Sequence, residues 1–64
     1  MLVNVAIINK ELDGNYYAYW YDDNANLRVE ADADEVYLES KIINELGVIE
    51  VTFGYNYWND TLDI

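Results

Sequence analysis

The chain has 64 residues, of which 13 are Asp or Glu and three are Lys or Arg, so its formal net charge is −10. It contains neither cysteine nor histidine, which excludes disulfides, thiolate metal sites and the side chain that most often binds zinc or transfers protons near neutral pH. The charge also argues against direct binding to nucleic acids or anionic membranes, because both are polyanions. A hydrophobic content of 53% still predicts a folded chain, with one domain over residues 1–64.

We expect a cytoplasmic protein. No apolar run approaches the length of a membrane-spanning helix. The first residues, MLVNVAIINKE, lack the basic leader and the small-residue cleavage pattern of a signal peptide.

The first half of the chain predicts two strands joined by a turn. Residues 2–9 are rich in β-branched side chains, and residues 15–21, NYYAYWY, alternate as a partner strand. Between them, Asp13-Gly14 suits the positive φ of a tight hairpin. Alternation divides the second strand into two rows, of which one helix can cover only one. The rows are Tyr17, Tyr19 and Tyr21 on one face, and Tyr16, Ala18 and Trp20 on the other.

A second turn and a short third strand are predicted next. Residues 22–26, DDNAN, carry Asp and Asn side chains that can bond to nearby backbone amides. Residues 27–31, LRVEA, predict a strand that turns Leu27 and Val29 inward and Arg28 and Glu30 outward.

A helix is predicted from about residue 34 to residue 46, with Gly47 as its stop. Asp32 or Asp34 is the expected N-cap, and Asp32 with Glu35 approximates a capping box. The expected apolar stripe contains Val36, Leu38, Ile42, Ile43 and Leu46, with Glu39 at its edge.

Residues 48–58, VIEVTFGYNYW, predict a last strand, because apolar and polar residues alternate along them. The resulting fold class is α+β, a small antiparallel sheet of three to four strands with one helix packed on one face, in the order β-β-(β)-α-β. The expected apolar face of this strand holds Ile49, Val51, Phe53, Tyr55 and Tyr57.

The residues that catalysis requires are missing from the sequence. Ser40 is the only serine and has no histidine or cysteine to activate it, and the three glycines are too widely separated to cradle a phosphate. The acidic segment 30–35, EADADE, does not match a calcium-binding loop in either possible register. We therefore expect no enzyme, no cofactor and no specific calcium or zinc site, although loose binding of divalent cations stays open.

The same segment carries a regular arrangement of charge. In an extended chain Glu30, Asp32 and Asp34, here called the acidic row, point the same way at intervals of about 6.5–7 Å. That interval is close to the distance between successive phosphates of a nucleic-acid strand. The alternative is that Asp32 and Asp34 only cap the helix and that Glu30 is solvated. Four further acids extend the row if they fold onto the same side, namely Asp22, Asp23, Glu35 and Glu39.

Aromatic residues beside these acids suggest a protein-binding surface. Tyrosine gives a large contact area at low entropic cost and makes cation–π contacts with arginine. If the row of Tyr17, Tyr19 and Tyr21 is the exposed one, it supplies such contacts. The alternative is that the tyrosines serve core and cross-strand packing.

A short, cysteine-free, strongly acidic and tyrosine-rich α+β chain resembles phage-encoded anti-defence proteins, including anti-CRISPR and antirestriction DNA mimics. The resemblance is one of composition and size over the whole chain and involves no diagnostic motif. It implies a non-enzymatic inhibitor in the bacterial cytoplasm that mimics DNA charge. Its partner would be the basic, nucleic-acid-binding surface of a CRISPR effector or, second, of a restriction or DNA-repair enzyme. The other interpretation is an acidic interaction module that forms a homodimer through its aromatic sheet face.

Overall fold

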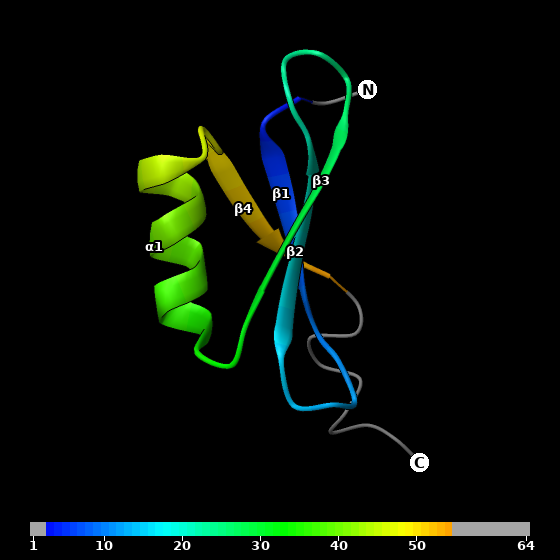
Figure 1. Ribbon diagram of the computed structural model, residues 1–64, viewed down its shortest axis with the longest axis vertical. Helices are drawn as coiled ribbons and strands as arrows, with labels where there is room; N and C mark the ends of the chain where they lie inside the picture. Colours follow the sequence, from blue (N-terminus) through cyan, green and yellow to red (C-terminus); the bar gives the residue numbers. More distant parts are fainter. Residues whose placement is uncertain (1–2, 55–64) are drawn as a thin grey trace.

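The structure, a computed structural model, describes residues 3–54 as a four-stranded sheet with one helix (Figure 1). The α+β class and the predicted order of elements are confirmed, and the third strand is fully formed. The elements in chain order are β1 (Val5–Lys10), β2 (Tyr16–Tyr21), β3 (Leu27–Asp32), α1 (Glu35–Glu45) and β4 (Glu50–Phe53).

The strands lie in the order β3-β2-β1-β4. The β1–β2 and β2–β3 pairs are antiparallel, whereas β4 lies parallel to β1. The prediction of a wholly antiparallel sheet is therefore wrong for the last strand. The reason is the connection, because α1 returns the chain along the sheet and β4 then runs in the direction of β3 and β1.

Residues 11–15 and 22–26 close the two hairpins with the same hydrogen-bond pattern. In each turn, the N–H of the fourth residue donates to the carbonyl of the first, at 3.0 Å for Gly14 and 2.9 Å for Ala25. The N–H of the first residue donates to the carbonyl of the fifth. The fourth residue is left-handed in both turns, with φ of +89° at Gly14 and +65° at Ala25. Glycine adopts this conformation freely, but the Cβ of alanine makes it unfavourable.

Asp34 is the residue that starts α1. Its Oδ1 accepts the backbone N–H of Val36 at 3.0 Å and of Tyr37 at 3.2 Å. The predicted capping pair of Asp32 and Glu35 is wrong, because Asp32 accepts the N–H of Asp34 at 2.8 Å and so fixes the cap itself. Of the two expected N-caps, Asp34 is correct.

The helix ends where the glycine predicts. Gly47 has a φ of +84°, and the N–H of Val48 donates back to the carbonyl of Ile42 at 3.0 Å. At 11 residues, α1 falls well short of a membrane span, and the described part of the chain holds no helix long and apolar enough to cross one.

The core lies between α1 and one face of the sheet. Side chains of Ile8 and Trp20 from the sheet meet Leu38 and Ile42 from the helix, all of them fully buried. Alternation in β2 therefore turns Tyr17, Tyr19 and Tyr21 to the face without a helix, which the sequence alone did not decide. The buried core residues are Ala6, Ile8, Ala18, Trp20, Leu38, Ile42 and Val48.

Strand β3 faces the opposite way from the prediction. Leu27 and Val29 are 56% and 48% exposed, while Arg28 and Glu30 pair with Trp20 and Ala18 on the helix side. β3 is an edge strand that α1 covers only in part, so long polar side chains fit at this position.

The predicted apolar faces of the helix and of the last strand are only partly correct. Val36 and Ile43 of the expected helix stripe are exposed, and so is Ile49, which precedes β4. Val51 packs against the core, whereas Phe53 is 43% exposed. The expected positions of Tyr55 and Tyr57 lie outside the described residues.

The first prediction concerns the left-handed alanine. Ala25→Gly should stabilise the fold by about 0.5–1 kcal/mol, because relief of the left-handed penalty exceeds the added freedom of the unfolded chain. Urea unfolding measures the change. Ala33→Gly is the matched control, since Ala33 is exposed and its φ is not positive, and it should destabilise by about 0.5–1 kcal/mol. Equal destabilisation by both substitutions would contradict the role given to the φ of Ala25.

Candidate functional site

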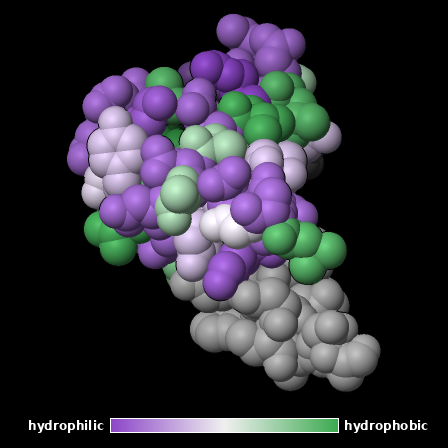
Figure 2. Space-filling view, turned by 60° about the horizontal axis from the view of Figure 1, so that its bottom comes forward, coloured by the Kyte–Doolittle hydropathy of each residue, from purple (hydrophilic) through white to green (hydrophobic). Residues whose placement is uncertain are grey.

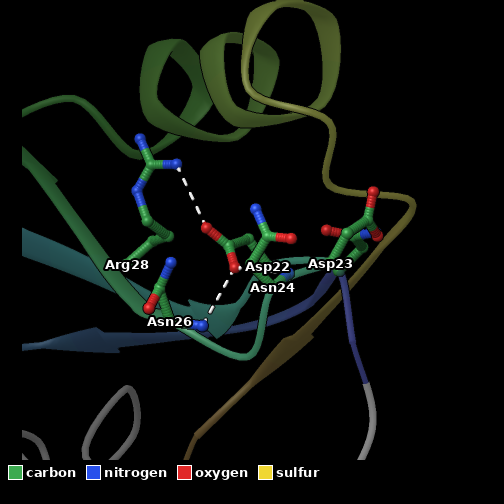
Figure 3. Close-up of polar contacts among 6 residues, drawn as sticks. Asp22, Asp23, Asn24, Asn26 and Arg28 are labelled. Carbon is green, nitrogen blue, oxygen red and sulfur yellow. Dashed lines mark hydrogen bonds and ion pairs between the residues drawn. The ribbon is translucent and has the colours of Figure 1, made fainter.

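Asp22 organises the β2–β3 turn (Figure 3). Its Oδ1 accepts the backbone N–H of Asn24 and of Asn26, both at 2.9 Å, and its Oδ2 lies 3.7 Å from Nη1 of Arg28. The hydrogen bond from Asn26, then that from Asn24, then the charge of Arg28 hold the pKa of Asp22 below its ordinary value. Asp22 is thus a charged residue whose bonds shape the turn.

Asp23 connects this turn to the start of β1. Nδ2 of Asn4 donates to Oδ1 of Asp23 at 2.6 Å. Asn4 has a positive φ of 59°, its N–H donates to the carbonyl of Tyr21, and its carbonyl accepts the N–H of Ile49. This asparagine therefore joins the ends of three strands, and Asp23 holds its side chain.

The acidic row is part of a strand only over its first two members. Glu30 and Asp32 lie on the same side of β3, but a bend at Ala33 separates them from Asp34, whose own backbone angles are extended. The regular interval over all three residues stays a prediction. Each also has a local partner, since Oε1 of Glu30 lies 3.4 Å from Nζ of Lys41 and the two aspartates accept backbone N–H groups. The hydrogen bond that Lys41 donates to Glu30 raises the pKa of Lys41. The capping role of Asp34 is established, while contact of the row with a partner stays a prediction.

Two glutamates of α1 extend the acids of the row onto the helix. Glu35 and Glu39 stand one turn apart, both half-buried. Burial raises the pKa of Glu35, and the adjoining Glu39 carboxyl and the charge of Asp34 raise it further. Oε2 of Glu35 is enclosed and accepts no hydrogen bond. An ionised Glu39 cannot donate one, because an ionised carboxylate carries no proton. This pair is an electrostatic weak point of the fold.

The predicted acidic residues do not form one continuous surface. Asp22 and Asp23 lie in the turn before β3, and the acidic row lies at its far end, about 20 Å away by strand geometry. Within residues 3–54, no three carboxylates come close enough to hold a metal ion.

The predicted tyrosines form a continuous row on the face of the sheet opposite α1. The rings of Tyr17 and Tyr19 stack at a centroid distance of 6.5 Å and an angle of 17°. The hydroxyl of Tyr17 donates to Oδ2 of Asp13 at 2.6 Å, which lowers the pKa of Asp13 and raises that of Tyr17. We call the surface around them the tyrosine face. It consists of Ile7, Tyr17, Tyr19, Tyr21, Leu27 and Val29.

Apolar side chains on this face are open to solvent. Ile7 is 46% exposed and Tyr21 is 40% exposed, in addition to Leu27 and Val29 of β3. The side of the molecule shown in Figure 2 has hydrophobic groups directly beside hydrophilic ones on the described part of the surface. Apolar groups bordered by polar ones are typical of surfaces that bind proteins.

Sequence reasoning placed Arg28 on the outward face of the third strand and missed the positions of both Arg28 and Lys10 on the helix side of the sheet. Nζ of Lys10 lies 5.9 Å from the ring centroid of Tyr16, and the guanidinium carbon of Arg28 lies 5.9 Å from that of Trp20. The alternation of side chains along the strands, combined with their register, predicts this placement, because Lys10 and Arg28 occupy the same side of the sheet as the buried Trp20.

Comparisons with protein-family models, with curated proteins and with solved structures give no match. The function is therefore argued from the geometry and charge of this chain.

The second prediction concerns Glu35 and Glu39. A carboxyl group whose pKa is raised by folding binds its proton more tightly in the folded state, so its stabilising effect is complete below the unfolded pKa and is lost as pH rises through the folded pKa. Glu39→Gln should remove the part of that loss that the Glu39 carboxyl causes, while the part due to burial of Glu35 remains, and should stabilise the protein by about 0.3–0.5 kcal/mol near neutral pH. Urea unfolding from about pH 4 to about pH 7 measures it.

The control is Glu45→Gln, which makes the same charge change at an exposed position in the last turn of α1. It should leave the pH dependence above about pH 4 unchanged. Asp13 and Asp22 do not interfere, because their lowered pKa values place their effect below that range, where stability is lost as pH falls. Equal pH profiles for the two variants would contradict the coupling of Glu35 to Glu39.

Proposed function

We propose that the protein is a non-enzymatic inhibitor that presents DNA-like charge and occupies the basic, nucleic-acid-binding surface of another protein. The observation that supports this proposal is the balance of bound and unbound charge. The only cations, Lys10, Arg28 and Lys41, already contact Tyr16, Trp20 and carboxylates of the same chain. A net charge of −10 remains, and a cationic partner would relieve its self-repulsion.

The acidic row supplies the part of this surface that is most like a phosphate backbone. Hydrogen bonds fix Asp32 and Asp34 at the start of α1, and Lys41 positions Glu30. Side chains that are already ordered lose less entropy on binding. The row therefore presents its charges at positions that β3 and the start of α1 hold fixed, as a groove built for DNA requires.

The target class follows from the resemblance to phage anti-defence proteins. A CRISPR effector is the first candidate, and a restriction or DNA-repair enzyme is the second. Such an inhibitor would act in the cytoplasm of a bacterial host. It needs no catalytic group, because occupation of the DNA-binding surface is sufficient to block activity.

A homodimer is the competing function, and the exposed apolar residues of the tyrosine face favour it. Charge opposes it, because two copies would bring together two net charges of −10. Sedimentation at low and high salt separates the two ideas. A dimer that forms only at high salt would favour the interaction module, and a monomer throughout would remove it.

The third prediction tests the acidic row. The double variant Glu30→Gln and Asp32→Asn removes two charges but keeps an oxygen in place of each carboxylate acceptor. It should displace a labelled DNA from the target effector about tenfold less well, since charge-assisted contacts across an interface are stronger than neutral ones. Fluorescence anisotropy of the DNA measures displacement, and the effect should shrink at high salt.

The matched control is Glu11→Gln with Glu45→Gln, which makes the same change in net charge away from the row. It should lose much less activity than the row variant. Equal displacement of DNA by both variants, with equal unfolding curves, would show that the row is not the contact surface. Failure of the unmodified protein to displace DNA from CRISPR, restriction and repair enzymes alike would contradict the inhibitor function.

A further inference from the structure

The sheet separates the cations of this chain from its tyrosine row. Lys10 and Arg28 lie on the helix side of β1 and β3, and Lys41 of α1 pairs with Glu30 on that same side. These three are the only Lys and Arg residues of the whole sequence. The tyrosine face consequently contains no lysine or arginine.

Carboxylates are present on the face from which cations are absent. Asp13 binds the hydroxyl of Tyr17 at one end of the tyrosine row. Glu50 of β4 is exposed and pairs with Val5, which places it on the side of the sheet away from α1. The face thus combines stacked phenol rings, exposed aliphatic groups and negative charge.

We propose that the tyrosine face is a docking surface for an arginine-bearing surface of the partner protein, an inference that rests on the proposed function and adds to the acidic row a second contact surface on the opposite side of the sheet. The guanidinium plane stacks on the rings of Tyr19 and Tyr21, because an aromatic face attracts a cation. Its aliphatic stem contacts Leu27 and Val29. Glu50 accepts a charge-assisted hydrogen bond at the edge.

Arginine suits this face better than lysine does. The guanidinium group is planar and weakly hydrated, so it stacks on tyrosine and bonds to a carboxylate at the same time. A second copy of this chain fits less well. Its own tyrosine face has the same negative charge, and its three cations lie on the other side of its sheet in contact with its own residues.

The fourth prediction uses an oligoarginine peptide as the probe, with oligolysine of equal length for comparison. In an NMR titration of the whole protein, oligoarginine should bind more tightly than oligolysine and should shift the amide signals of β2 and β3 around Tyr19, Tyr21 and Val29. Tyr21→Ala should weaken oligoarginine binding about threefold. Tyr37→Ala removes a tyrosine from α1 that is more exposed than Tyr21, at 55% against 40%, and should leave the affinity unchanged.

A charge pair gives a second, independent readout. Glu50→Lys should weaken oligoarginine binding about fivefold more than Glu45→Lys, although both make the same change in net charge. Equal losses, or equal affinities of Tyr21→Ala and Tyr37→Ala, would overturn the assignment. If oligoarginine shifts only the amide signals of Glu30, Asp32 and α1, the assignment of the tyrosine face is overturned, while the inhibitor function stays intact. If neither peptide binds, both the docking surface and the inhibitor function are contradicted. If the same amide signals shift when the protein is diluted without peptide, the face belongs to a dimer instead.

Discussion

The packing of α1 against one side of a four-stranded sheet determines the rest of this molecule. Trp20 and Ile8 on the sheet meet Leu38 and Ile42 on the helix, and among residues 3–54 these four are the largest fully buried side chains. Because strand residues alternate, burial of Trp20 necessarily directs Tyr19 and Tyr21 outward. The aromatic richness of β2 therefore serves two surfaces at once, a core on one side and a tyrosine face on the other. The chain has no second helix in residues 3–54 to cover that face.

The acidic residues contribute to the fold at the points where the chain changes direction. Asp13 accepts the N–H of Asn15 in the first turn, Asp22 does the same for residues of the second turn, and Asp34 caps α1. A carboxylate that accepts backbone N–H groups is stabilised in its charged form. Part of the net charge of −10 is thus offset by local bonds, and the acids are distributed over both ends of the sheet. Glu35 and Glu39, in contrast, stand together on α1, where burial and the Glu39 carboxyl raise the pKa of Glu35.

The elements of this fold follow from local signals, but its pairings do not. Alternation identified β1 and β2, and Gly14 and Gly47 marked a turn and a helix end, where both adopt the positive φ that glycine reaches freely. The direction of β4 depended on the path of α1 across the sheet, which no local pattern encodes. The faces of β3 were inverted because Arg28 and Glu30 find partners on the helix side, in Trp20 and Lys41. For the site, the sequence indicated the acids and the tyrosine row, whereas the segregation of the cations required the strand pairing.

Several carboxylates of the proposed contact surface also stabilise the fold, which constrains how the charge of this protein can evolve. An acid that is fixed by backbone N–H groups presents its charge at a defined position and stays ionised to lower pH, as at Asp13 and Asp22. The pKa of Glu35 shifts in the opposite direction, so its charge weakens first as pH falls. Acidification would therefore reduce the negative potential at the start of α1 before that of the turns. A cationic partner would retain its attraction to Asp13, and through it to the tyrosine face, after the helix end had begun to lose its charge.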